Sequence, residues 1–189
     1  GDLDGSLNLS PNDGDNSGEV VISVTDSGNP NVSSVDTFMV NINHYPTWEV
    51  IESIELLEGT STSLSINASD SDGDSISLVL DTENSPSYAV LDGSSLTLSP
   101  DIGADDGVVV ISLSDDGTPS AVISIEIPVD ILHTPTISNL TDQTINEDEV
   151  LTFDLEISDQ DGDDVTVSAT SNNENVSVSL DGLSLTLSA

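Results

Sequence analysis

Two short acidic segments of the chain have the residue types and spacing of a metal site. The first reads Asp70-Ser71-Asp72-Gly73-Asp74, and the pattern returns as Asp159-Gln160-Asp161-Gly162-Asp163. Carboxylates at alternate positions around a glycine can turn several oxygens toward one point. Calcium takes about six to eight oxygen ligands in a flexible shell. The pattern therefore predicts Ca²⁺-binding loops, whereas Asp92-Gly93 and Asp181-Gly182 are predicted to be simple hairpin turns.

The charge of the chain favours bound cations. It has 189 residues, of which 36 are acidic and none is lysine or arginine, and its formal net charge is −36. Such a chain cannot neutralise phosphates, so nucleic acid and anionic membrane surfaces are excluded as partners. Its self-repulsion opposes compaction unless counter-ions bind. The excess charge could simply keep a secreted protein soluble. The more specific interpretation is that divalent cations form part of the fold.

The two acidic segments belong to an internal repeat with an offset of 89 residues (159 − 70 = 89). Pro46-Thr47 matches Pro135-Thr136 at the same offset, and the back half of the pattern matches from Pro11 to His44. The repeat predicts three segments: residues 1–44 are the C-terminal half of one repeat, 45–133 a complete repeat, and 134–189 the N-terminal half of a third.

Hydrophobic residues alternate with polar ones inside each repeat, as in Leu64, Ile66 and Ala68 or Val109, Ile111 and Leu113. This period of two is typical of half-buried strands, and Asp-Gly turns separate the runs. No segment shows helical spacing, and disorder is rejected because 35% of the residues are hydrophobic. We expect an all-β fold of tandem immunoglobulin-like β-sandwich repeats with about seven strands each.

This topology would bring separate acidic loops together. The strand before Asp70 and the strand at residues 108–114 both run toward the preceding repeat. They deliver Asp70–Asp74 and Asp115-Asp116-Gly117 to the end where the linker Asn41–His44 lies. An EF-hand is excluded because strands flank the loops and Thr170 stands where the second copy would need its last acid. The predicted metal sites therefore lie at junctions between repeats.

At this point the motifs resemble those of a known family. Asp70-x-Asp72-Gly73-Asp74, Leu96-Thr97-Leu98-Ser99-Pro100 and Val40-Asn41-Ile42-Asn43-x-x-Pro46-Thr47, in this order and spacing, resemble bacterial cadherin-like tandem repeats. Such repeats occur in very large extracellular adhesins and surface fibres. The resemblance covers the whole chain and implies an extracellular, cell-surface location, with calcium held between successive domains.

The resemblance also implies a ligand set at each junction. The ligands expected near residue 44 are Asn41, Asn43, Asp70, Asp72, Asp74 and Asp115. Those expected near residue 133 are Glu58, Asp130, Asp159, Asp161 and Asp163. The chain departs from the family pattern at His44 and His133, two residues before the linker prolines, and at Leu132, which replaces Asn43. Because the two histidines lie a whole domain apart, we interpret them as linker residues and not as a transition-metal pair.

The leading hypothesis is a structural segment of a calcium-stabilised extracellular fibre or adhesin stalk. The alternative is a glycan- or protein-binding module of a secreted multidomain protein, for which Trp48 with Tyr45 is the only candidate cluster; Trp48 is otherwise expected to cap the sandwich. An enzyme is not expected, because no nucleophile–base pair is present and the acidic loops recur in each repeat.

The expected partners are neighbouring repeats of the same or an adjacent chain, and a cell-surface glycan or protein for the alternative. No apolar run approaches the roughly 18 residues of a membrane helix, so direct membrane insertion is not expected. Residues 134–189 need a cover equivalent to residues 101–133. Either the chain is a window from one long covalent array, which a gap-free repeat favours, or separate subunits complete one another by strand exchange.

Overall fold

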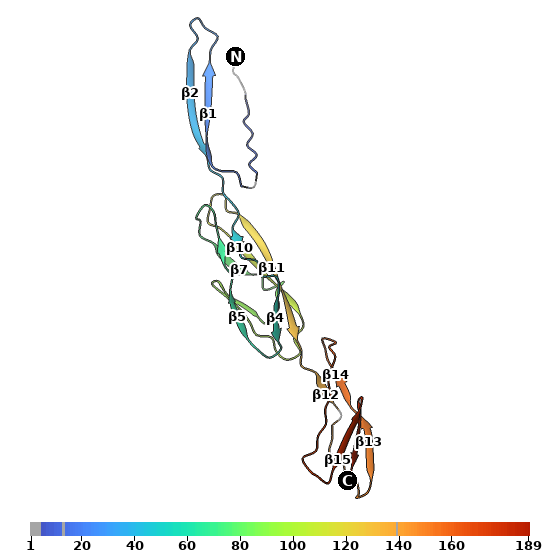
Figure 1. Ribbon diagram of the computed structural model, residues 1–189. Coiled ribbons are helices and arrows are strands. Elements are labelled where there is room, and N and C mark those ends of the chain that lie inside the picture. The colour runs from blue at the N-terminus through green and yellow to red at the C-terminus, as the bar shows by residue number, and fades with distance from the viewer. Residues whose placement is uncertain (1–4, 13, 139) are drawn as a thin grey trace.

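The computed structural model describes residues 5–12, 14–138 and 140–189. These residues form strands β1 to β16 and no helix, so the described part of the chain has no helix that could cross a membrane. The predicted all-β fold class is confirmed. Figure 1 shows three groups of strands that follow one another along an elongated molecule. Every sheet lies within one of the three predicted repeat segments.

The middle group is a two-layered sandwich. One layer has the strand order β4-β11-β10-β7 and the other β5-β9-β8, with a short pair β3-β6 at one end. The bounds are β3 Thr47–Trp48, β4 Ile54–Leu57, β5 Thr62–Ser65, β6 Ala68–Ser69, β7 Ser77–Leu80, β8 Ala89–Asp92, β9 Ser95–Leu98, β10 Gly107–Ser114 and β11 Val122–Leu132. With β3/β4 as a split first strand and β5/β6 as a split second strand, this order is that of an immunoglobulin-like sandwich.

The core of this sandwich follows the alternation in the sequence. Val109, Ile111 and Leu113 on β10 are fully buried, while the residues between them face outward. They pack in one cluster with Ile127 of β11 and with Leu96 and other residues of the facing layer. Burying one such side chain contributes roughly 1.5–3 kcal/mol. The alternation therefore decides which face of each strand is buried. The loops that join the strands lie at the two ends of the sandwich.

The flanking groups repeat parts of the same architecture. Near the N-terminus, β1 (Gly18–Thr25) and β2 (Ser33–Val40) form an antiparallel hairpin that corresponds to β10 and β11 at the offset of 89 residues. Toward the C-terminus, β12 pairs with β14, and β13-β16-β15 form a three-stranded sheet. Their bounds are β12 Thr136–Ser138, β13 Val150–Asp154, β14 Glu156–Ser158, β15 Ser177–Asp181 and β16 Ser184–Ser188.

Strand direction places the acidic loops as the sequence predicts. β6 ends at Ser69, directly before Asp70, and β10 ends at Ser114, directly before Asp115. Both strands run toward the linker that follows β2. Pro128 lies within β11, and a proline inside a sheet is confined to an edge strand, the start of a strand or a bulge. Because β4 pairs with β11 only from Val129 onward, β11 is an edge strand up to this proline.

Candidate metal centres between the units

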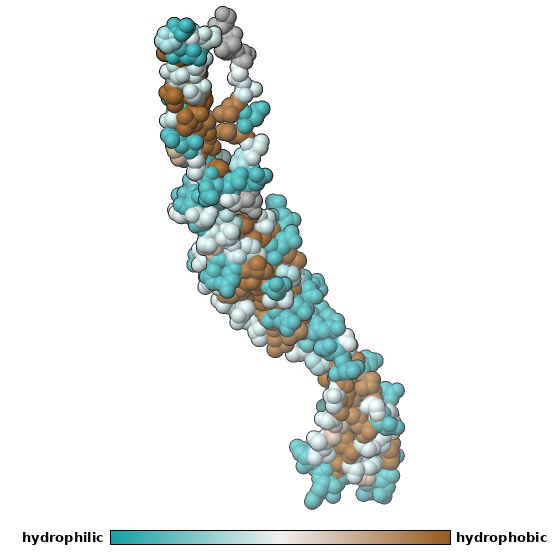
Figure 2. Space-filling view, turned by 45° about the horizontal axis from the view of Figure 1, so that its top comes forward, coloured by the Kyte–Doolittle hydropathy of each residue, from teal (hydrophilic) through white to brown (hydrophobic). Residues whose placement is uncertain are grey.

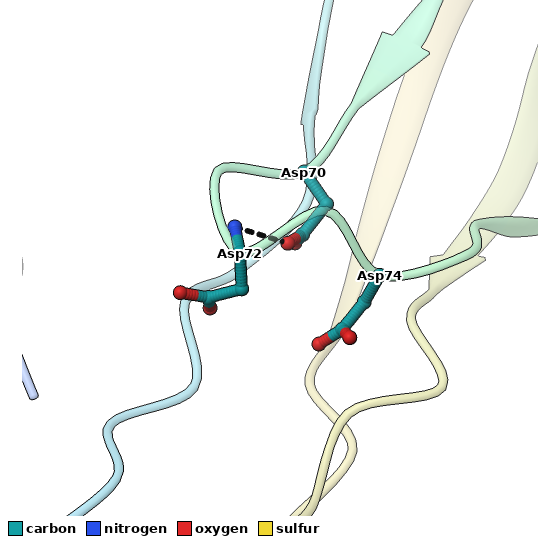
Figure 3. A group of neighbouring side chains, drawn as sticks. All are labelled: Asp70, Asp72 and Asp74. Atoms are coloured by element: carbon teal, nitrogen blue, oxygen red, sulfur yellow. Dashed lines mark hydrogen bonds between the residues drawn. The ribbon is translucent and has the colours of Figure 1, made fainter.

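The two predicted acidic loops bring their carboxylates together. One oxygen each from Asp70, Asp72 and Asp74 lie within 4.8 Å of one another, and so do oxygens of Asp159, Asp161 and Asp163. Figure 3 shows the three side chains on the first loop and the bond between the Asp72 N–H and the Asp70 carboxylate. The Asp72 N–H donates to Asp70 Oδ1 at 2.8 Å, and the Asp161 N–H donates to Asp159 Oδ1 at 3.0 Å. Each loop is thus a compact turn with its carboxylates gathered.

The glycine inside each loop is required by the backbone. Gly73 has φ 85° and Gly162 has φ 80°, in the left-handed region that residues with a Cβ rarely adopt. This conformation reverses the chain between the second and third aspartate. The sequence pattern therefore encodes the convergence of the carboxylates through both the spacing of the acids and the glycine.

One carboxylate oxygen of the first loop lacks a protein partner. Asp70 Oδ2 is buried and has no hydrogen-bond partner among the described residues. Beside it, burial together with the negative charges of Asp70, Asp116, Asp115 and Asp72 raises the pKa of Asp74. A buried acceptor without a partner is costly. The loop therefore offers oxygen ligands and an excess of negative charge, and a bound hard cation would satisfy both.

Asp115 holds its own loop and also contacts the linker. Its Oδ1 accepts hydrogen bonds from the N–H groups of Gly117 and Ala121 at 3.0 and 2.9 Å, and its Oδ2 accepts one from Asn43 Nδ2 at 2.9 Å. Burial opposes ionisation of Asp115, but these donors outweigh it and lower the pKa of its carboxyl. Asp26, its repeat counterpart, accepts the same two backbone bonds from Gly28 and Val32. Closing this turn is therefore one function of Asp115.

The linker and the acidic loop share one cleft near residue 44. Four of the predicted ligands, Asn41, Asn43, Asp72 and Asp74, line it, and so does Asp116. Gly117 closes the cleft, since a Cβ at this position would lie 2.6 Å from Asp74 Oδ2 and would overlap the Asn43 side chain. The sequence analysis places Asp116 at this junction with its loop but does not count it among the expected ligands. Asp70 lines a second cleft, which Asp74 also lines.

Glu58 connects the middle unit to the segment that follows it. Its Oε1 accepts hydrogen bonds from the N–H and the hydroxyl of Thr134 at 2.9 and 2.7 Å, and its Oε2 accepts one from the Gly103 N–H at 2.7 Å. The two bonds from Thr134, followed by that from Gly103, lower the pKa of Glu58 to about 2. Glu58 is buried and charged, and it has three donors for its two oxygens.

The remaining predicted ligands near residue 133 lie in two clefts. Asp130, Asp161 and Asp163 line one of them, together with Asp105 and Asp106. Glu58 and Asp159 line the other, and His133 and Gln160 border both. Burial, with the charges of Asp106, Glu55 and Asp161, raises the pKa of Asp130. The structure thus divides the five predicted residues between two neighbouring clefts and adds Asp105 and Asp106, which the sequence analysis missed.

Each histidine binds the middle aspartate of the acidic loop that follows it. His44 Nδ1 lies 2.9 Å from Asp72 Oδ1, and His133 Nδ1 lies 2.7 Å from Asp161 Oδ1. The backbone N–H of each histidine donates to the same carboxylate. The aspartate raises the pKa of each histidine, and the histidine lowers the pKa of each aspartate.

The histidines are linker residues, as the sequence analysis interprets them, but their bond to the acidic loop was missed. Nε2 of His44 and of His133 contacts the backbone oxygens of Asp15 and Ala104, respectively, at 2.9 Å. Each imidazole therefore joins the unit before the linker to the unit after it. The histidine and the aspartate are 28 residues apart in both copies, as the repeat requires.

The two aromatic residues proposed for the alternative binding function differ in their surroundings. Trp48 is partly buried and packs against the hydrophobic core, as expected for a cap on the sandwich. Tyr45 is 61% exposed. The pair therefore does not form a common exposed platform.

No family model matches the chain, and no curated protein sequence matches it. Among solved structures, the N-terminal eight Ig domains of Down Syndrome Cell Adhesion Molecule are similar at 15% identity and TM-score 0.49, over 89% of this chain and 30% of that one. The protocadherin gammaB7 EC3-6 structure is similar at 15% identity and TM-score 0.48, over 92% and 51%.

A third similar structure is a nucleoside hydrolase-related hypothetical protein from Saccharophagus degradans that is associated with carbohydrate metabolism. It has 20% identity and TM-score 0.40, over 48% of this chain and 26% of that one. The chain spans about a quarter to a half of the length of these structures. The fold assignment itself rests on the strand order.

Proposed function

We propose that the chain is a calcium-stabilised segment of an extracellular fibre or adhesin stalk, in which cations bind between successive β-sandwich units. The observation that carries the proposal is the buried, unpartnered Asp70 Oδ2 in a loop of three converging carboxylates. Lysine and arginine do not occur in the chain, so no such cation can neutralise this cluster. Calcium would supply the missing charge and accept several oxygen ligands at once.

The chain's residues would act on both sides of each linker. Near residue 44, Asp70, Asp72 and Asp74 with the linker residues Asn41 and Asn43 would hold the ion, and Asp115 and Asp116 would place the adjoining loop. Near residue 133, the ligands would come from Asp159, Asp161 and Asp163, with Asp130 and Glu58 contributed by the middle unit. Ions in these places would restrict the angle between units, and a stalk needs this stiffness.

Location and adhesion context rest on the resemblance of the motifs to bacterial cadherin-like repeats. The end-to-end order of the units and the extreme acidity are consistent with an extracellular stalk. Nothing in the described residues favours a catalytic role. A glycan-binding function has less support, because Trp48 packs against the core.

A calorimetric titration of the calcium-free chain with Ca²⁺ tests the proposal, with Asp70→Asn as the variant and Asp92→Asn as its control. Both substitutions remove one charge, but Asp92 is exposed at the end of β8, next to a simple hairpin turn. At about a hundredfold excess of calcium over Kd, binding should stabilise the fold by roughly 2.7 kcal/mol, seen as a higher melting temperature.

We expect Asp70→Asn to weaken Ca²⁺ binding and to reduce the thermal shift, and Asp92→Asn to leave both unchanged. X-ray scattering should show a narrower range of angles between units with calcium than with EDTA. Identical melting and scattering in calcium and in EDTA would refute the proposed metal role.

A further inference from the structure

The β1–β2 hairpin exposes an apolar face that is buried in its repeat counterpart. Ile22 is 45% exposed, Val24 60% and Phe38 41%, whereas their counterparts Ile111, Leu113 and Ile127 are each 0% exposed. Figure 2 shows hydrophobic atoms exposed along the N-terminal hairpin. The same sequence pattern is thus covered in the middle unit and uncovered in the first.

Both outer edges of this hairpin lack a neighbour among the described residues. In the middle unit, β10 pairs with β7 and β11 pairs with β4. At the offset of 89 residues, the counterparts of β7 and β4 are residues 166–169 and 143–146. Both segments lie in the third unit, and neither forms a strand there. The chain therefore contains both the open edges of the hairpin and the two segments that could pair with them. The edges belong to the first unit and the segments to the third.

Among the described residues, the main sheet of the third unit has no second layer packed over it. This sheet, β13-β16-β15, corresponds to β5-β9-β8, which in the middle unit packs against β10 and β11. Leu185 on β16 is only partly buried, whereas its counterpart Leu96 is 0% exposed. This sheet therefore has an inner face with no second layer over it among the described residues.

We propose that residues 134–189 of one copy of this chain pack against the β1–β2 hairpin of a second copy and complete a sandwich like that of residues 45–133. Residues 166–169 would pair antiparallel with β1, and residues 143–146 would pair in parallel with residues 40–43, which are the last residue of β2 and the start of the linker. The registers are those of the middle unit, which place Ser168 opposite Ser23 and Gln143 opposite Val40. Repetition of this contact would link copies head to tail.

One polar residue near the end of the chain supports this pairing. Glu147 is exposed, whereas its counterpart Glu58 is buried and accepts a hydrogen bond from Gly103 N–H. The counterpart of Gly103 is Gly14, and both have a positive φ, of 83° at Gly14 and 76° at Gly103. In the completed unit, Glu147 of one copy would reach Gly14 of the other. One core position differs, since Asp36 stands where the middle unit has Ile125.

Neither strand pairing uses the acidic loops, but residues 40–43 include Asn41 and Asn43, which are proposed calcium ligands. The pairing of residues 166–169 with β1 uses no proposed ligand, so a test of that pairing is separate from a test of the metal function. Consecutive segments of a covalent array would form the same contact within one chain. Repulsion between copies of charge −36 opposes assembly, so the experiment needs about 0.15 M salt, which limits the Debye length to about 8 Å.

Disulfide trapping between full-length copies tests the register, because the chain has no cysteine of its own. An equimolar mixture of Ser23→Cys and Ser168→Cys chains should form a disulfide-linked dimer on mild oxidation. The matched control mixes Ser23→Cys with Thr144→Cys, which lies on the segment for the opposite edge of the sheet. We expect at least tenfold less dimer from the control mixture. Equal yields from the two mixtures, or dimer from neither, would overturn the proposal.

Sedimentation of full-length variants without cysteine tests the apolar face. The parent chain should show a mass that rises with protein concentration. Ile22→Asp places a charge on the proposed contact face and should abolish this rise, whereas Val21→Asp adds the same charge on the opposite face and should retain it. A parent chain that stays monomeric at all concentrations, or two variants that behave alike, would contradict the proposed contact.

Discussion

Glu58 and Thr134 are joined by two hydrogen bonds across the boundary between two repeat segments, at 2.9 Å from the Thr134 N–H and 2.7 Å from its hydroxyl. The Gly103 N–H binds the other carboxylate oxygen. One carboxylate of the middle unit therefore holds both its own loop and the first residues of the next segment. The connection between the units is a polar clamp in addition to the chain itself.

Replacing Glu58 with Gln should loosen this clamp. The amide keeps one acceptor oxygen but loses the charge that strengthens its hydrogen bonds. Hydrogen exchange at the Thr134 and Gly103 amides should accelerate by about an order of magnitude. Glu126→Gln, on the exposed face of β11, is the matched control and should leave both rates unchanged. Unaltered exchange in Glu58→Gln would show that the clamp does not hold the linker.

The contribution of Glu58 should disappear in acid. Its pKa is lowered from 4.5 to about 2, so its carboxylate stabilises the folded state above pH 4.5 and loses this effect as the pH falls toward 2. The difference in melting temperature between the parent chain and Glu58→Gln should therefore shrink across this interval. A difference that stays constant from pH 5 to pH 2 would contradict the lowered pKa.

The two histidines should titrate above their ordinary pKa of 6.5. The raised pKa means that each His–Asp pair stabilises its junction fully below pH 6.5 and weakens as the pH rises through the pKa of the folded state. Because the chain has only two histidines, NMR can follow both imidazoles separately. Asp72→Asn should lower the pKa of His44 and leave that of His133 unchanged, and Asp161→Asn should do the reverse. If either variant moves both values or neither, the pairing is not as described.

Equivalent core leucines should differ in their effect on stability. Leu96 is fully buried, and Leu96→Ala should destabilise the middle unit by about 2–5 kcal/mol. Its counterpart Leu185 is only partly buried, so Leu185→Ala should cost clearly less in dilute solution. Denaturant unfolding of the two variants measures the difference. Equal losses would mean that the third unit is covered as completely as the middle one.

The sequence could predict the strands and the placement of the acidic loops because both depend on local patterns. Alternation at Val109, Ile111 and Leu113 determines which face of β10 is buried, and the glycine in each acidic loop permits its reversal. The all-β fold follows from these patterns directly. The two Asp-x-Asp-Gly-Asp loops gather their carboxylates within a few residues, and such short-range geometry is visible in the sequence.

The partners across each linker could not be predicted in the same way. Contacts such as His133 with Asp161 and Glu58 with Thr134 depend on the approach of one unit to the next, which no local period encodes. The division of Glu58 and Asp130 between two clefts has the same cause. Asp105 and Asp106 were missed because their turn lies directly before β10, and the direction of β10 in the folded unit is what brings this turn to the cleft. Whether each predicted ligand binds calcium stays a prediction.

The parallel pairing of β4 with β11 has a mechanical consequence. The chain enters the middle unit at the end nearest the β1–β2 hairpin, and it leaves after β11 at the opposite end, toward β12 (Figure 1). Tension along the molecule would pull β4 toward the entry and β11 toward the exit. Because the paired residues Ile54–Leu57 and Val129–Leu132 run side by side in one direction, this force loads their hydrogen bonds in shear, all at once. Strands loaded in this way must break together and cannot peel apart one bond at a time, so the unit should resist extension along its own axis.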